Sequence, residues 1–85
     1  MEIEVVNDKK GIFEFRILDK DPGLAELIVE RLNEDKDVSF AAYKWEHPLA
    51  GYPLIVVKSK DPKASLKKAI KSIVKELKGI EKVLE

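Results

Sequence analysis

The sequence predicts an α+β domain of two layers, in which a four-stranded antiparallel sheet carries two helices on one face. Alternation of apolar and charged residues with a period of two, near the start of the chain, indicates strands with one solvent-facing side. Two Asp-Pro pairs, each followed by an apolar pattern of helical period, indicate two helix starts. The resulting order, β-β-α-β-β-α, differs from a ferredoxin-like fold, which needs its first helix after one strand.

Length and composition predict one domain that spans residues 1–85. Its 16 basic and 16 acidic residues give no net charge, which argues against a general attraction to nucleic acid or anionic membranes. No cysteine is present, so disulfides and thiolate metal sites are excluded. No apolar run approaches the roughly 20 residues of a membrane span, and the acidic start does not resemble a signal peptide. We therefore expect a cytoplasmic protein.

The first part of the chain, up to Leu18, predicts a β-hairpin. Ile3 and Val5 alternate with glutamates, and the segment 13–17 alternates phenylalanine or isoleucine with charged residues. The polar run 7–11 ends in glycine and supplies turn residues for the connection. Because two strands alone are only marginally stable, we expect the hairpin to pair with later strands.

The first helix is predicted to begin at Asp21-Pro22, because aspartate is a good N-cap and proline at the first helical position gives up no needed donor. Its apolar residues cover well over half of the helix circumference, more than one sheet requires. They are Leu24, Ala25, Leu27, Ile28, Val29 and Leu32. The polar segment 33–37 ends this helix.

A strand rich in β-branched and aromatic residues is predicted from Val38 to Trp45, as the central strand of the sheet. Pro48 cannot donate to a strand ladder and restricts the residue before it, so 47–49 should form a rigid exit from this strand. After a loop, the segment 54–57 is apolar at every position and predicts a strand buried on both faces. We expect the phenylalanines to fill the core: Phe13, Phe15 and Phe40.

The second pair, Asp61-Pro62, predicts a helix that runs to the vicinity of Gly79, with a frayed continuation towards Leu84. A stop or weakening is expected at Gly79, because glycine costs roughly 1 kcal/mol inside a helix. Its apolar residues are spaced alternately four and three apart, as in a coiled-coil seam: Leu66, Ile70, Ile73, Leu77, Ile80 and Leu84. Ala69 and Val74 widen the seam. The opposite face carries a row of lysines: Lys67, Lys71, Lys75 and Lys78.

These lysines reflect an asymmetry that the neutral net charge hides. Residues 58–85 contain nine lysines against four acidic residues, whereas residues 1–57 contain seven basic against twelve acidic residues. A lysine face can follow phosphates. No aromatic residue or arginine lies among these lysines, and thermostable proteins commonly have lysine- and glutamate-rich surfaces. We therefore expect a solvated face without sequence-specific nucleic-acid binding.

The centre of the chain carries a resemblance to a known family. Phe40-Ala41-Ala42-Tyr43, followed three residues later by His47-Pro48-Leu49, resembles the signature of archaeal DNA-directed RNA polymerase subunit L, a small alpha-like dimerisation subunit. Length, element order and the spacing from the first helix to the turn also agree with this family. The family opens its first helix with Asp-His-Thr and places an Asn one turn later. In these places the chain has Asp21, Pro22, Gly23 and Glu26.

Few residues offer catalysis or metal binding. His47 is the chain's single histidine, and its neighbour Glu46 points to the opposite face of an extended segment, so the two do not act as an acid/base pair. One histidine with scattered carboxylates lacks the clustered ligands of a transition-metal site. We predict no catalytic residue, no metal and no cofactor, and a structural role for the turn at His47.

Both helices carry more apolar surface than one sheet can cover, so the sequence predicts an obligate helical interface. Its predicted residues are Leu27, Ile28, Val29, Leu66, Ala69, Ile70, Ile73, Val74 and Leu77. The resemblance implies that the partner is the D subunit of RNA polymerase, which connects the chain to the large polymerase subunits as a non-catalytic assembly platform for transcription. Two alternatives stay open: a stand-alone homodimeric module of the same fold, and a small enzyme similar to the pterin dehydratases, which rely on several histidines.

Overall fold

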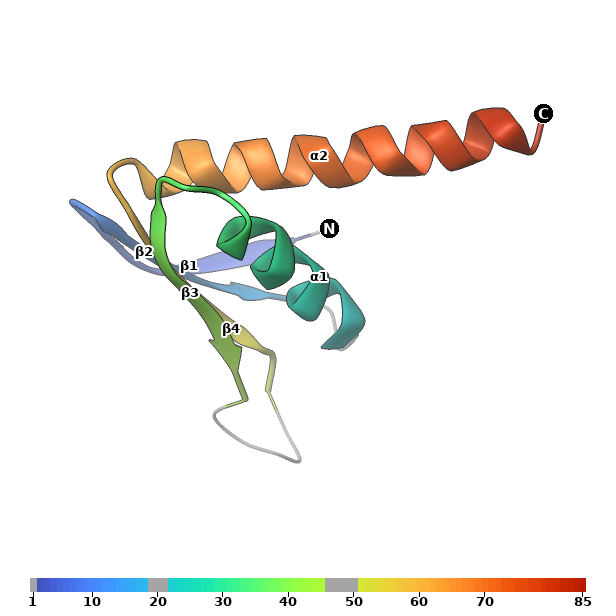
Figure 1. Ribbon diagram of the computed structural model, residues 1–85. Helices are drawn as coiled ribbons and strands as arrows, with labels where there is room; N and C mark the ends of the chain where they lie inside the picture. Colours follow the sequence, from blue (N-terminus) through green and yellow to red (C-terminus); the bar gives the residue numbers. More distant parts are fainter. Residues whose placement is uncertain (1, 19–21, 46–50) are drawn as a thin grey trace.

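A computed structural model describes residues 2–18, 22–45 and 51–85 and confirms the predicted element order (Figure 1). The four strands form one antiparallel sheet, and both helices pack on one of its faces. The α+β two-layer prediction is therefore confirmed. The elements are β1 (Ile3–Lys9), β2 (Ile12–Ile17), α1 (Pro22–Asn33), β3 (Val38–Lys44), β4 (Leu54–Ser59) and α2 (Pro62–Val83).

The strands are ordered β1-β2-β4-β3, so β4 lies inside the sheet and β3 at its edge. The prediction that Val38–Trp45 forms the central strand is therefore wrong. Aromatic and β-branched residues indicate that a segment is extended, but its place in the sheet depends on pairing with distant residues. β4 has the burial expected of an inner strand, because Leu54, Ile55 and Val57 are buried and Val56 is half-buried.

The β1–β2 hairpin has a tighter turn than the sequence predicts. Strand pairing continues as far as Lys9 opposite Ile12, so only Lys10 and Gly11 remain for the turn, in place of the whole run 7–11. Gly11 has a φ of +82°, a left-handed conformation that other residues rarely adopt. The glycine thus allows the chain to reverse within two residues.

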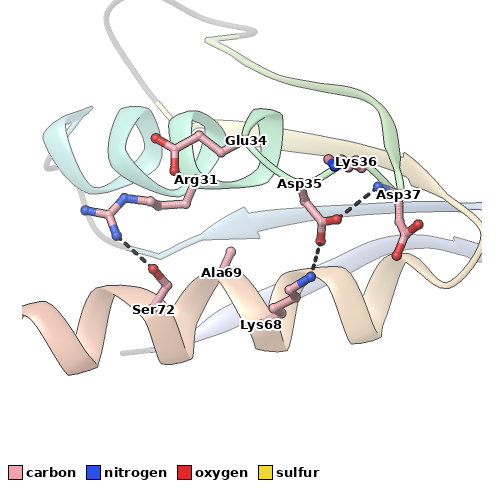
Figure 2. A pocket seen from close by; sticks show the side chains of 8 residues that line it. All are labelled: Arg31, Glu34, Asp35, Lys36, Asp37, Lys68, Ala69 and Ser72. Atoms are coloured by element: carbon pink, nitrogen blue, oxygen red, sulfur yellow. Dashed lines mark hydrogen bonds and ion pairs between the residues drawn. The ribbon is translucent and has the colours of Figure 1, made fainter.

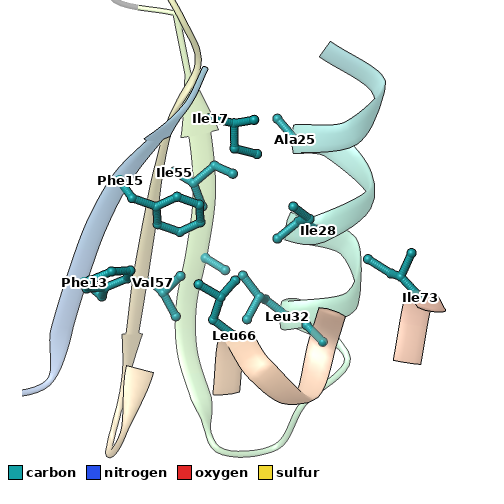
Figure 3. Close-up of a cluster of buried hydrophobic side chains, with 12 residues drawn as sticks. Phe13, Phe15, Ile17, Ala25, Ile28, Leu32, Ile55, Val57, Leu66 and Ile73 are labelled. Carbon is teal, nitrogen blue, oxygen red and sulfur yellow. The ribbon is translucent and has the colours of Figure 1, made fainter. Parts of the chain in front are cut away.

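The core lies between the sheet and the two helices (Figure 3). Alternate residues of the inner strands, among them Phe15 and Ile55, meet Ile28 and Leu32 of α1 and Leu66 of α2. Full burial of such a side chain stabilises the folded state by roughly 1.5–3 kcal/mol. The core therefore uses the sheet-facing sides of both helices, and any partner must bind the surface that remains.

α2 begins as predicted and continues past Gly79. The Asp61 carboxylate accepts a hydrogen bond of 3.2 Å from the Ala64 backbone N–H and caps the helix. The helix does not stop near Gly79, one of the two expectations there, but continues to Val83 through the stretch where fraying is predicted. A single glycine costs about 1 kcal/mol, which does not end a helix whose neighbouring residues are good helix formers. Within the described ranges, no helix is long and apolar enough to cross a membrane.

Candidate partner interface

α2 is longer than the sheet on which it packs. Its 22 residues span about 33 Å, whereas strands of six or seven residues span about 20 Å. The first half of the helix lies over the sheet beside α1, and the second half projects past the sheet (Figure 1). The last buried residue of α2 is Ile73. Residues 74–84, the distal arm, thus extend into solvent.

One side of the distal arm is apolar and exposed. Leu77 is 60% exposed, although Ile73 of the same seam is buried one turn earlier, and Val83 near the end of the arm is 84% exposed. A cluster of large apolar side chains exposed to solvent marks a surface that a partner can cover. This set of residues, named the distal stripe, consists of Val74, Leu77, Ile80, Val83 and Leu84.

The structure divides the predicted interface residues into three groups. Two are exposed in the distal arm: Val74 and Leu77. Three are half-buried and pack against the core: Leu27, Val29 and Ile70. The remaining four lie in the chain's own core, at most 8% exposed, and do not present their side chains to a partner: Ile28, Leu66, Ala69 and Ile73. The reason is geometric, because the sheet and α1 together bury the α2 seam as far as Ile73, and Ile28 faces the same core from α1.

Three residues of the distal stripe lie outside the predicted interface: Ile80, Val83 and Leu84. The sequence does hold a signal for two of them, because Ile80 and Leu84 continue the spacing of the seam. The expected stop or weakening at Gly79 is the reason that the predicted interface ends at Leu77. The exposed part of the seam therefore extends beyond the predicted interface, although not beyond the predicted seam.

A groove of about 500 Å³ separates the end of α1 from the middle of α2 (Figure 2). Arg31 of α1 crosses it, donating a hydrogen bond of 2.9 Å to Ser72 Oγ and an ion-paired hydrogen bond to the Glu76 carboxylate. At the other end of the groove, Lys68 Nζ lies 3.7 Å from a carboxylate oxygen of Asp35. Two ion pairs thus connect α1 and the loop after it to α2.

Two of the cations that line this groove, Arg31 and Lys68, are paired with carboxylates. The hydrogen bond to Glu76 is the largest influence on Arg31 and raises the pKa of the guanidinium, which keeps it charged. Asp35 also accepts a hydrogen bond of 2.9 Å from the Asp37 backbone N–H, which shapes the loop before β3. In the part of the chain that the structure describes, no three His, Cys, Asp or Glu residues gather to hold a metal ion. The ion pairs across the groove therefore hold α1 and the loop after it to α2.

The motif that carries the resemblance lies partly in β3. Ala41 is buried and Tyr43 packs against the core, whereas Phe40 and Ala42 alternate onto the face turned away from the helices. The prediction that Phe40 fills the core is wrong. Its side chain is 47% exposed, and the Lys58 ammonium lies 5.3 Å from its ring centre. The other motif residues lie outside the described ranges: Asp21, His47, Pro48 and Leu49.

Comparison with known proteins gives a family for this arrangement. The family described as RNA polymerase Rpb3/Rpb11 dimerisation domain matches residues 13–83, which include all of β2 but its first residue, both helices and the greater part of the distal arm. The chain belongs to this family. Membership in the Rpb3/Rpb11 dimerisation family agrees with the exposed apolar surface on α2, since a dimerisation domain requires a surface for its partner.

Several relatives are named DNA-directed RNA polymerase subunit Rpo11. The Pyrococcus furiosus subunit is 31% identical over 85 residues, covering 94% of this chain and 90% of the relative. The Methanothermobacter thermautotrophicus subunit is 32% identical over 71 residues, or 84% of each chain. The Thermococcus sibiricus subunit is 45% identical over 49 residues, and this match spans 58% of the chain and about half (52%) of the relative.

A solved structure supports the fold of this Rpb3/Rpb11 family member. The crystal structure of DNA-directed RNA polymerase subunit L from Thermoplasma acidophilum superposes with a TM-score of 0.87 and 24% sequence identity. The similarity covers 98% of this chain and 84% of that one. At this level of identity the comparison shows a shared fold.

Proposed function

We propose that the chain is a non-catalytic assembly subunit of DNA-directed RNA polymerase, equivalent to subunit L, and that it heterodimerises with the polymerase D subunit. The observation that carries the proposal is the distal stripe, an apolar surface on an arm that the chain's own sheet does not reach. Membership in the Rpb3/Rpb11 dimerisation family and similarity to Rpo11 subunits support the choice of assembly.

The proposed interface is the distal stripe with its half-buried flanks. Leu77, Ile80 and Leu84 keep the alternating spacing of a coiled-coil seam, so a partner helix can lie along the arm with interdigitating side chains. Full coverage of a leucine or isoleucine contributes roughly 1.5–3 kcal/mol. Ile70 continues the seam of α2 back towards the core, and the half-buried α1 residues of the predicted interface, Leu27 and Val29, also pack against the core.

In this role the chain supplies a surface for assembly and no chemistry of its own. The D subunit would connect it to the large subunits, which hold the polymerisation chemistry, and the complex would act in the cytoplasm. The turn at His47-Pro48-Leu49 would then shape the domain without touching substrate. The lysines on the far side of α2 would remain solvated and would not read DNA sequence.

A second copy of the chain is the competing occupant of the distal stripe. An apolar surface does not by itself select a different partner, and a seam of this spacing can pair with another copy of itself. The homodimer therefore serves as the alternative that the experiment must distinguish.

The test is affinity purification of a tagged copy expressed in its source cell. The tagged chain should bring down the D subunit together with the large polymerase subunits. The double variant Leu77→Lys/Ile80→Lys should lose them, because it places charges in the distal stripe without altering the core. Lys75→Glu is the matched control, since it changes an exposed residue on the opposite side of the same arm and should retain every partner.

Two outcomes would contradict the proposal. Recovery of the tagged chain with only untagged copies of itself would favour the homodimer. Equal recovery of the D subunit by the double lysine variant would place the interface somewhere other than the distal stripe.

A further inference from the structure

Arg31 ties α1 to α2 across the start of the distal arm. Its guanidinium contacts two residues one helical turn apart, Ser72 at 2.9 Å and Glu76. The Arg31 side chain is 13% exposed and that of Glu76 is 64% exposed. The ion pair therefore lies at the boundary between the buried half of α2 and the arm, with its arginine inside and its carboxylate at the surface.

Glu76 lies within the distal stripe rather than beside it. At about 100° per residue, its position on the helix circumference falls between Ile80, one turn later, and Val83, two turns later. A partner that covers both of these side chains must also remove water from the Glu76 carboxylate. Loss of water by a carboxylate without a cationic partner is strongly unfavourable.

We propose that Arg31 is a positioning residue of the partner interface: by holding the Glu76 carboxylate, it allows a partner helix to cover Ile80 and Val83 without burying that carboxylate unpaired. This inference rests on the proposed function, because it concerns the same surface. It assigns a binding role to a residue of α1 that lies outside the exposed apolar surface.

The hydrogen bonds from Arg31 to Ser72 and Glu76 also fix the direction of the distal arm. Bonds to two successive turns of α2 oppose rotation of the helix about its axis, and an arm that is ordered before binding loses less entropy when it docks. The Lys68–Asp35 pair connects the same side of the molecule at the other end of the groove. This pair borders the buried half of α2 and does not touch the distal stripe. Lys68 is therefore a matched control for Arg31.

The test measures the dissociation constant of the complex between the full chain and the purified polymerase D subunit, with the thermal midpoint of each free chain. Arg31→Met should raise the dissociation constant about tenfold or more, because it leaves the Glu76 carboxylate unpaired in the interface. Arg31→Met/Glu76→Met should return it to within about threefold of wild type, since apolar replacement of both members of a pair is commonly tolerated. Lys68→Met should remain within about threefold.

Arg31→Lys is included because it retains the charge if Arg31→Met fails to fold, and its dissociation constant should lie closer to wild type than that of Arg31→Met. Equal binding by wild type and Arg31→Met, at unchanged thermal midpoints, would overturn the inference. So would a double variant as weak as Arg31→Met, because the arginine would then act through packing rather than charge compensation. Absence of binding by the wild-type chain would overturn the proposed function itself, and the inference with it.

Discussion

The two halves of α2 carry the same apolar spacing in opposite surroundings. In the first half, Leu66 and Ile73 are buried against the sheet and α1, whereas in the second half Leu77 and Ile80 are more than half exposed. The spacing specifies an apolar side of the helix, and the length of the sheet decides how much of that side the chain covers by itself. The first half therefore contributes to folding, and the second half is left for recognition.

Truncation of one residue in each half should separate these roles most clearly. Ile73→Ala should lower the free energy of unfolding by about 2–5 kcal/mol, because it leaves a cavity in the core. Leu77→Ala should lower it by less than about 0.5 kcal/mol, because the side chain is exposed. Urea unfolding followed by circular dichroism measures both values. Similar losses at the two positions would mean that the arm packs on the chain after all.

Removal of the N-cap should weaken the first half of α2 by a smaller amount. Asp61→Ala deletes the carboxylate that accepts the Ala64 N–H, and should lower the free energy of unfolding by about 1 kcal/mol. Lys60→Ala, at the exposed neighbouring position, is the control and should have little effect. Thermal unfolding of the two variants provides the comparison. An Asp61→Ala variant as stable as wild type would show that the buried residues alone fix the start of the helix.

A change at Gly79 should stabilise the second half alone. An alanine Cβ at this position would meet nothing within 4 Å beyond the helix's own neighbouring backbone, so the substitution fits without a clash. Gly79→Ala should favour the helix by up to about 1 kcal/mol and slow amide exchange in the distal arm up to about fivefold, with core amides unchanged. Hydrogen exchange resolved by residue is the measurement. Equal slowing in α1 would indicate that arm and core open as one unit.

The smallest effect is expected on the lysine side of the arm. Lys75 is exposed and lies opposite the distal stripe. Lys75→Glu should change the dissociation constant of the complex with the D subunit by less than about threefold, because exposed charges contribute little. Titrations at low and high salt provide the check. A steep loss that depends on salt would instead place this face in contact with a charged partner.

The sequence predicts well the features that depend on residues close together in the chain. Asp61-Pro62 begins α2 where expected, and the alternating residues Phe13 and Phe15 are buried as expected. The place of β3 in the sheet is not predicted correctly, because strand order depends on contacts between distant residues. Phe40 is exposed for a different reason, because the alternation along β3 places it on the face of the sheet that the helices do not cover.

The sequence predicts which side of α2 is apolar, but it does not predict how much of that side remains exposed. The seam spacing identifies the apolar side of α2, but the turn at which the helix leaves the sheet depends on strand length. The glycine penalty at Gly79 also points to an end that the helix does not have. The Arg31–Glu76 pair joins residues 45 positions apart, and no local pattern indicates it.

The most direct test of the distal stripe as an uncovered partner surface is sedimentation velocity of the purified chain at tens of micromolar, alone and with the polymerase D subunit. The wild-type chain alone should self-associate, because the stripe has no other way to leave water, and the D subunit should replace self-association with a heterodimer. Leu77→Lys/Ile80→Lys should remain monomeric in both samples with an unchanged thermal midpoint. A wild-type chain that stays monomeric alone and in the presence of the D subunit would contradict the assignment of the distal stripe as a partner interface.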